Sequence, residues 1–93
     1  MLYIRICFDK PGLSSVRESV RDEHRAYVRS GVTKTIQAGP LCAGDADDTN
    51  TGSFFIVEAD TREQVVKFHE NDPLTKAGLY GEALIHRWDK HIG

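Results

Sequence analysis

The fold of this chain follows from residues 16–27, which read VRESVRDEHRAY. A helix turns by about 100° per residue, so apolar residues three, four and seven positions apart share one face. The stripe that results here consists of Leu13, Val16, Val20 and Tyr27, with His24 inside it. The residues Glu18, Asp22, Glu23 and Arg25 are expected to face away. The pattern predicts an amphipathic helix from Leu13 or Ser14 to Ser30, with Gly31 just past its end.

Four strands and a second helix are expected around this helix. Leu2–Phe8 alternates in the manner of a strand, and the turn residues 9–12 separate it from the helix. Val32–Ala38 is β-branched and is expected to stop pairing at Gly39-Pro40. The nearly continuous apolar run Ser53–Ala59 predicts a central strand. The last strand is predicted over residues 82–88.

The second helix is predicted to begin at Asp60, with Glu63 at capping-box spacing, and to end at Asn71-Asp72-Pro73. A short further turn follows over residues 74–78. Cys42–Gly52 has almost no apolar content and is expected to be a loop. The three aspartates of that loop lack the spacing of a calcium loop, which favours a solvated turn over a cation site.

The predicted order is βαββαβ, a ferredoxin-like α+β fold with an antiparallel sheet, built as one domain over residues 1–93. Both helices would cover one face of the sheet. Either Tyr3, Arg5 and Cys7 or the alternate residues of that strand would then lie on the other face. A bare, half-apolar sheet favours association, so we expect a homodimer through the sheet faces.

Composition excludes several classes of protein. The net charge of −2 provides no basic stripe for nucleic acid, and no apolar run is long enough to span a membrane. Two cysteines are too few for a disulfide framework or an iron–sulfur cluster, and no metal-ligand spacing is present. We therefore expect a cytoplasmic protein without metal or cofactor.

His24 is the main candidate for chemistry, because an ionisable imidazole lies where a core residue is expected. It could be a core histidine with satisfied nitrogens, or a general acid/base at the floor of a pocket. A carboxylate partner could come from Asp72 or Asp9, and we favour Asp72. The alternative for Asp72 is a simple helix-ending turn.

Arg17 and Arg21 are candidates for binding a substrate anion, since guanidinium groups hold planar anions through two hydrogen bonds. The alternative is pairing with acidic neighbours along the helix surface. Neither cysteine lies in a setting that would favour a reactive thiolate.

The chain resembles the YCII-related (YciI-like) family along its whole length. The matching elements are the strand ending in Asp9, Arg17-x3-Arg21-x2-His24, Ala38-Gly39-Pro40, Asp72-Pro73, Ala77-Gly78 and Tyr80. The resemblance implies a dimeric α+β barrel with a His–Asp pair, His24 and Asp72, lining a cleft. It leaves Arg17, Arg21, Asp9 and Tyr80 as further pocket candidates.

The resemblance also implies an enzymatic activity on small molecules of aromatic degradation, such as dehydrochlorination. The leading hypothesis is a cofactor-free lyase or isomerase in which His24 moves a proton on a small anionic or phenolic molecule. The competing hypothesis is a non-catalytic dimeric module that binds a small ligand or a protein, with His24 structural. The loop Cys42–Thr51 is shorter than expected for many relatives, so no particular substrate can be carried over.

Overall fold

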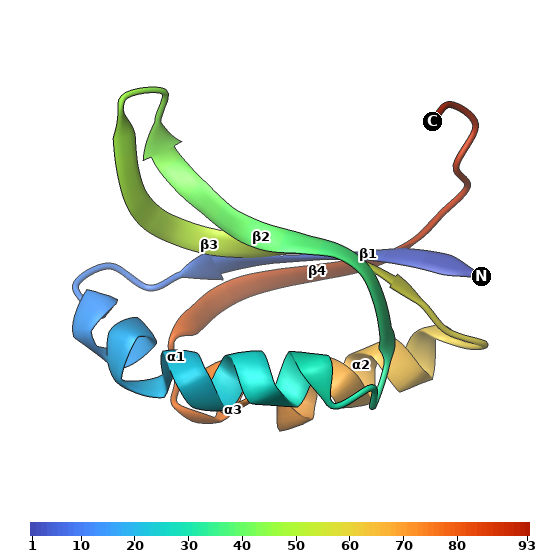
Figure 1. The fold of residues 1–93 in the computed structure, drawn as a ribbon, viewed down its shortest axis with the longest axis horizontal. Coiled ribbons are helices and arrows are strands. Elements are labelled where there is room, and N and C mark those ends of the chain that lie inside the picture. Colours follow the sequence, from blue (N-terminus) through green and yellow to red (C-terminus); the bar gives the residue numbers. More distant parts are fainter.

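The computed structural model describes residues 1–93 and has the predicted element order with one extra short helix. The elements are β1 (Leu2–Asp9), α1 (Ser14–Arg29), β2 (Lys34–Gly44), β3 (Asp47–Glu58), α2 (Arg62–Asn71), α3 (Pro73–Lys76) and β4 (Tyr80–Trp88). The strands form one antiparallel sheet in the order β2-β3-β1-β4. All three helices lie below this sheet (Figure 1). The predicted ferredoxin-like α+β fold is confirmed.

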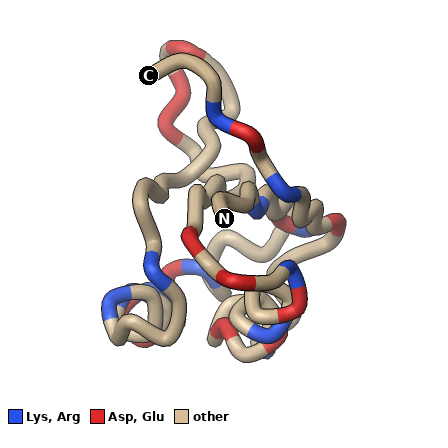
Figure 2. Tube along the Cα trace, turned by 90° about the vertical axis from the view of Figure 1, so that its right-hand side faces the viewer, with Lys and Arg blue, Asp and Glu red and all other residues tan.

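The helix α1 has the expected limits. It ends at Arg29, and Gly31 follows with a φ of 80°, a left-handed conformation that favours glycine. The helices α1 and α2 lie side by side in the end-on view of Figure 2. Tyr27 of α1 stacks on Phe68 of α2 with ring centroids 5.2 Å apart. The helix layer is therefore held by aromatic packing as well as by contact with the sheet.

The prediction that Gly39-Pro40 ends strand pairing is wrong. The strand β2 continues to Gly44, and Pro40 pairs with Ser53 of β3. Proline is tolerated here because β2 is an edge strand, whose outward-facing backbone groups need no partner. The predicted loop Cys42–Gly52 is likewise wrong, because most of it forms the two arms of the β2–β3 hairpin.

Two smaller boundaries also differ from the prediction. Thr61, not Asp60, caps α2, because its hydroxyl accepts from the Gln64 backbone N–H while the Gln64 side chain accepts from the Asp60 N–H. The polar run around the start of α2 offers several capping residues, so sequence alone placed the cap one residue early. The strand β4 begins at Tyr80, two residues before the predicted start.

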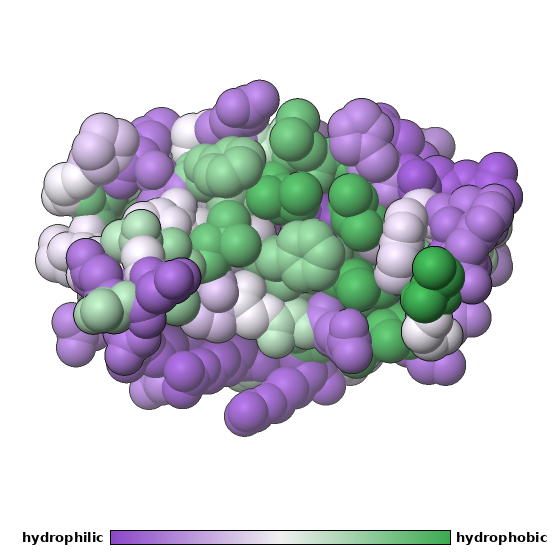
Figure 3. Space-filling model, turned by 90° about the horizontal axis from the view of Figure 1, so that it is seen from above, coloured by the Kyte–Doolittle hydropathy of each residue, from purple (hydrophilic) through white to green (hydrophobic).

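The two faces of the sheet differ sharply. Tyr3, Arg5 and Cys7 of β1 point towards the helices and are buried. The alternate residues lie on the open face, together with their neighbours on β3 and β4. Seen from above, this face has an apolar centre (Figure 3). Its apolar side chains are Leu2, Ile4, Ile6, Phe8, Phe54, Ile56, Leu84 and Trp88.

The two hydrophobic clusters of the core lie between sheet and helices, one centred on Phe55 and Val65 and the other on Leu74 and Leu79. No helix combines the length and apolarity needed to cross a bilayer.

Candidate functional site

His24 and Asp72 lie next to each other beneath the sheet. The His24 side chain projects from the middle of α1, and Asp72 occupies the break between α2 and α3. His24 Nδ1 lies 2.7 Å from Asp72 Oδ1. The break has a local cause, since Pro73 cannot continue α2 and Asp72 caps α3 by accepting from the Leu74 N–H. Packing of α3 on α1 then brings the carboxylate to the imidazole.

Asp72 is fully buried and remains charged. Burial raises its pKa, but the hydrogen bond from His24 and the positive charge of Arg5 outweigh this effect and bring the pKa below its ordinary value. An ionised carboxylate can only accept hydrogen bonds, so Nδ1 of His24 carries the proton. The other ring nitrogen, Nε2, is the one left for a ligand.

Arg5 completes this group from the sheet side. Its guanidinium is fully buried, and its NH2 group donates to Asp72 Oδ2 at 2.9 Å. Its Nε donates to His69 Nδ1 at 3.0 Å. The charge also lies over the rings of Phe55, Phe68 and Tyr80, at 4.8, 5.2 and 5.5 Å. Arg5 thus holds the second carboxylate oxygen while His24 holds the first.

Arg5 and His69 were not among the residues predicted for the site. The alternation of β1 put Arg5 on one face with Tyr3 and Cys7, which was the available signal. It did not say which face the helices cover. His69 has a pKa lowered by burial and by the charge of Arg5, so it accepts from Arg5 as a neutral imidazole.

A second network surrounds Arg17. Its guanidinium binds both carboxylate oxygens of Asp9, each at 2.8 Å, and also donates to Ser53 at 3.1 Å. The Ser53 hydroxyl in turn lies 3.2 Å from the Tyr80 hydroxyl. Burial raises the pKa of Tyr80 to about 12, with the charge of Asp72 adding to the effect. Tyr80 is therefore a neutral hydrogen-bonding group at neutral pH.

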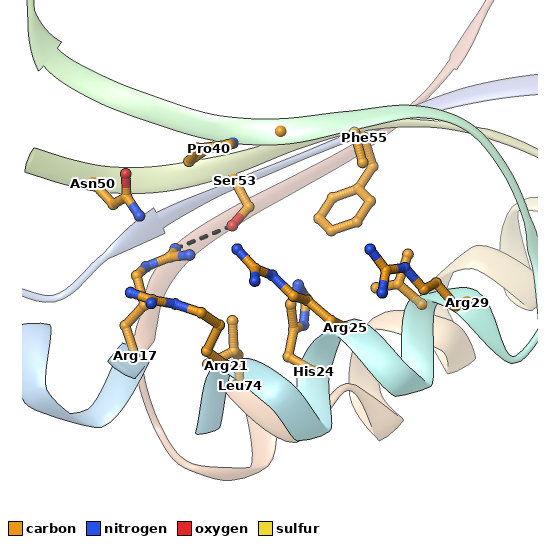
Figure 4. Close-up of a pocket in the computed structure, with 13 residues that line it drawn as sticks. Arg17, Arg21, His24, Arg25, Arg29, Pro40, Asn50, Ser53, Phe55 and Leu74 are labelled. Carbon is orange, nitrogen blue, oxygen red and sulfur yellow. Dashed lines mark hydrogen bonds between the residues drawn. The ribbon is translucent and has the colours of Figure 1, made fainter. Parts of the chain in front are cut away.

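A cleft of about 360 Å³ opens between α1 and the β2–β3 side of the sheet. The α1 side contributes His24, Arg17, Arg21, Arg25 and Arg29 (Figure 4). The facing wall is formed by the small residues of β2 and by β3, and Leu74 closes the floor. The remaining lining residues are Val28, Ala38, Gly39, Pro40, Asn50, Ser53 and Phe55. The lining contains no acidic side chain, so the cleft suits an anion.

The structure separates the predicted site residues into two groups. His24, Arg17 and Arg21 line the cleft, whereas Asp72, Asp9 and Tyr80 lie behind the residues that do. Arg25 is exposed, as expected for a residue off the apolar stripe, but it also borders the cleft, which the sequence did not predict. The edge of the sheet lies above this flank of α1, and Ala38, Gly39 and Pro40 are too small to fill the gap, so Arg25 borders a cleft.

No three His, Cys, Asp or Glu side chains gather in a way that could hold a metal ion. The aspartates at the β2–β3 turn are exposed. Cys7 is buried, and burial raises the pKa of its thiol to about 11.

The profile of the YCII-related domain matches residues 1–89. The chain belongs to the YCII-related family. The predicted resemblance is thereby confirmed, and Arg17, Arg21 and His24, three of the residues that carry it, lie on the α1 wall of the cleft.

Among solved structures, this YCII-related chain is similar to 5-chloro-2-hydroxyhydroquinone dehydrochlorinase (TftG) from Burkholderia phenoliruptrix AC1100, in complex with 2,5-dihydroxybenzoquinone. The two share 37% identity and a TM-score of 0.88 over 98% of this chain and 96% of that one. No curated protein matches in sequence.

More distant structures share the fold alone. An ethyl tert-butyl ether d (ethd) family protein from Bacillus halodurans has 11% identity and a TM-score of 0.55 over 96% of this chain and 99% of its own. An Agrobacterium tumefaciens protein has 15% identity and a TM-score of 0.53 over 92% and 89%. At such identities these matches carry no information about function.

Proposed function

We propose that this protein is an enzyme that transfers a proton on a small hydroxylated ring compound, with His24 as general acid/base. The observation that carries the proposal is the arrangement of one imidazole. Nδ1 is bonded to a buried carboxylate, while the same side chain lines an open cationic cleft and is 14% exposed. Asp72 sets the tautomer and stabilises the imidazolium that forms when Nε2 accepts a proton.

The similarity to TftG supports elimination of hydrogen chloride from a chlorinated, hydroxylated ring as the reaction class. Nε2 of His24 takes a proton from a ring hydroxyl, and the O–H electron pair forms a carbonyl. The proton then returns to the ring carbon that bears chlorine. A second ring hydroxyl then loses its proton and becomes a carbonyl. The electrons pushed into the ring expel chlorine, which leaves as chloride with the electron pair of the C–Cl bond. The products are a hydroxyquinone, H⁺ and Cl⁻, so the reaction needs no oxidant.

The arginines have different parts in this proposal. Arg17 is held by Asp9 and Ser53, with Tyr80 behind them, and so has a set position at one end of the cleft. Arg21 makes no ion pair within the protein. We assign Arg21 to the phenolate or other anion of the substrate, and Arg17 to the wall that places it.

The test is chloride release and quinone absorbance from chlorinated di- and trihydroxybenzenes, with lactones as a second panel. We expect His24→Ala to lower kcat by about 10²–10⁴-fold, the usual contribution of a placed base. The matched control is His91→Ala, because His91 is an exposed histidine in the C-terminal tail far from the cleft residues in sequence. Turnover that survives in His24→Ala would refute the proposal. Binding without turnover in wild type would favour the non-catalytic module instead.

We further propose that the protein works as a homodimer through the open face of the sheet. This face presents contiguous apolar side chains from β1, β3 and β4, and Phe8 is 41% exposed in the single chain (Figure 3). Patches of this kind mark interfaces in small proteins, and a second copy would supply a matching surface about a two-fold axis.

A further inference from the structure

The α1 wall of the cleft carries arginine at every fourth position: Arg17, Arg21, Arg25 and Arg29. Residues four apart follow one another along the same flank of a helix, so these side chains form a row. His24 lies between the second and third members of the row. The proposed proton transfer assigns parts to Arg17 and Arg21 alone and leaves Arg25 and Arg29 without one.

Three members of the row have no internal counter-charge. Arg17 is paired with Asp9, but Arg21, Arg25 and Arg29 form no ion pair. Glu18 lies three residues before Arg21 and Asp22 three before Arg25, which is a spacing that normally permits pairing along a helix. The arginines border the cleft instead (Figure 4).

Such a row has an energetic consequence. Like charges four residues apart repel one another and destabilise a helix. A single phenolate beside Arg21 would leave two guanidinium groups without an anion. A second anionic group on the ligand, beyond His24, would neutralise them.

The opposite wall restricts the shape of this ligand. Pro40 and Phe55 are apolar, and Gly39 and Ala38 present little more than backbone. A flat ring fits between such a wall and the stems of the arginines, which are themselves apolar. The cleft therefore combines a surface for a flat ring with two groups of positive charge, Arg21 before His24 along α1 and Arg25 with Arg29 after it.

We propose that Arg25 and Arg29 form a carboxylate subsite and that the ligand is a hydroxylated aromatic carboxylate, bound as a dianion when its phenol ionises. This rests on the proposed function for the position of the ring beside His24. The subsite itself would bind the carboxylate whether or not proton transfer follows.

The experiment compares 2,5-dihydroxybenzoate with 2,5-dihydroxybenzamide, its neutral analogue of nearly the same shape. Binding is measured by calorimetry or by NMR titration at low salt. Wild type is expected to bind the carboxylate about tenfold or more tightly than the amide, because charged hydrogen bonds to two guanidinium groups are lost in the amide. Added salt is expected to narrow the difference.

Three variants locate the effect. Arg25→Gln/Arg29→Gln is expected to bind both compounds equally, whereas Arg87→Gln, an exposed arginine on β4, should keep the preference. His24→Ala should also keep it, which separates the subsite from the proton-transfer proposal. The double variant removes like charges from α1, so its melting temperature should be no lower than that of wild type. Measuring the melting temperature therefore also checks that the double variant folds.

Equal binding of the two compounds to wild type would overturn the subsite. So would failure of the carboxylate to bind, or a preference that persists in Arg25→Gln/Arg29→Gln. A preference that is lost in Arg25→Gln/Arg29→Gln but kept in Arg87→Gln and in His24→Ala would support the subsite and locate it apart from the acid/base group.

Discussion

Asp72→Asn tests the buried charge pair most directly. Asparagine has the shape of aspartate and keeps an oxygen for the Leu74 N–H, so the cap of α3 is retained. The substitution removes the negative charge that faces Arg5 at 2.9 Å and His24 at 2.7 Å. The NH2 group of the asparagine amide is a hydrogen-bond donor, and it would face a donor where the carboxylate oxygen now accepts. Arg5 would then be a fully buried cation without a counter-ion.

Breaking a buried pair from one side costs about 3–5 kcal/mol. A domain of this size has a total unfolding free energy of roughly 5–15 kcal/mol, so we expect a loss of at least about a fifth of the stability. In urea, with a slope of about 2 kcal/mol per molar, the midpoint should fall by about 2 M. The assay is equilibrium unfolding followed by circular dichroism and tryptophan fluorescence.

Two variants control this prediction. Asp89→Asn changes an exposed aspartate and should alter the unfolding free energy by less than about 0.5 kcal/mol. Arg5→Met/Asp72→Asn removes both charges and should be more stable than Asp72→Asn alone, since the methionine leaves no unpaired cation. A loss below about 1 kcal/mol in Asp72→Asn, or a double variant no more stable than the single one, would refute the reasoning.

Further predictions concern stability at alkaline pH, the reactivity of the two thiols and the assembly state. Stability should fall as the pH rises from about 9 to 12, because the folded chain holds the protons of Cys7 and Tyr80 more tightly than the unfolded chain, with pKa values of about 11 and 12 against 9.0 and 10.0. Tyr80→Phe should flatten the upper part of this fall in urea unfolding at a series of pH values, and an unchanged profile would contradict the assignment. A thiol reagent should modify the exposed Cys42 in the native protein and reach Cys7 only on unfolding; rapid reaction of both thiols would count against the buried position of Cys7. Ile6→Glu places a charge in the apolar open face and should convert the expected dimer to monomer in analytical ultracentrifugation, with an unchanged assembly state as the opposing result.

Acid should also destabilise the protein through Asp72. Its pKa is lower in the folded chain than the ordinary value of 3.8, so the unfolded chain binds the proton first as the pH falls. The stability from the Asp72 network is therefore present above about pH 4 and is lost as the pH falls through the folded pKa.

The sequence by itself determined the element order and most of the helix limits. The apolar stripe of α1 and the Pro73 that ends α2 are local signals, because they depend on side chains a few residues apart. The expectation that His24 and Asp72 meet also came from sequence, through the side-by-side helices of a βαββαβ fold and through the family resemblance. Their 2.7 Å contact was measurable only in the folded chain.

The tertiary structure decided what lies behind and beside that pair. Arg5 sits 67 residues from Asp72 in the chain, and its burial depends on which face of β1 the helices cover, a choice that alternation leaves open. Arg25 lines a cleft only because an edge strand with small residues lies over its flank of α1. Pro40 stays in a strand for the same reason, since only the strand order makes β2 an edge. The surroundings of Arg5, Arg25 and Pro40 depend on which strands pair and on which face of the sheet the helices cover. These contacts join residues far apart in the chain, so the local sequence pattern does not determine them.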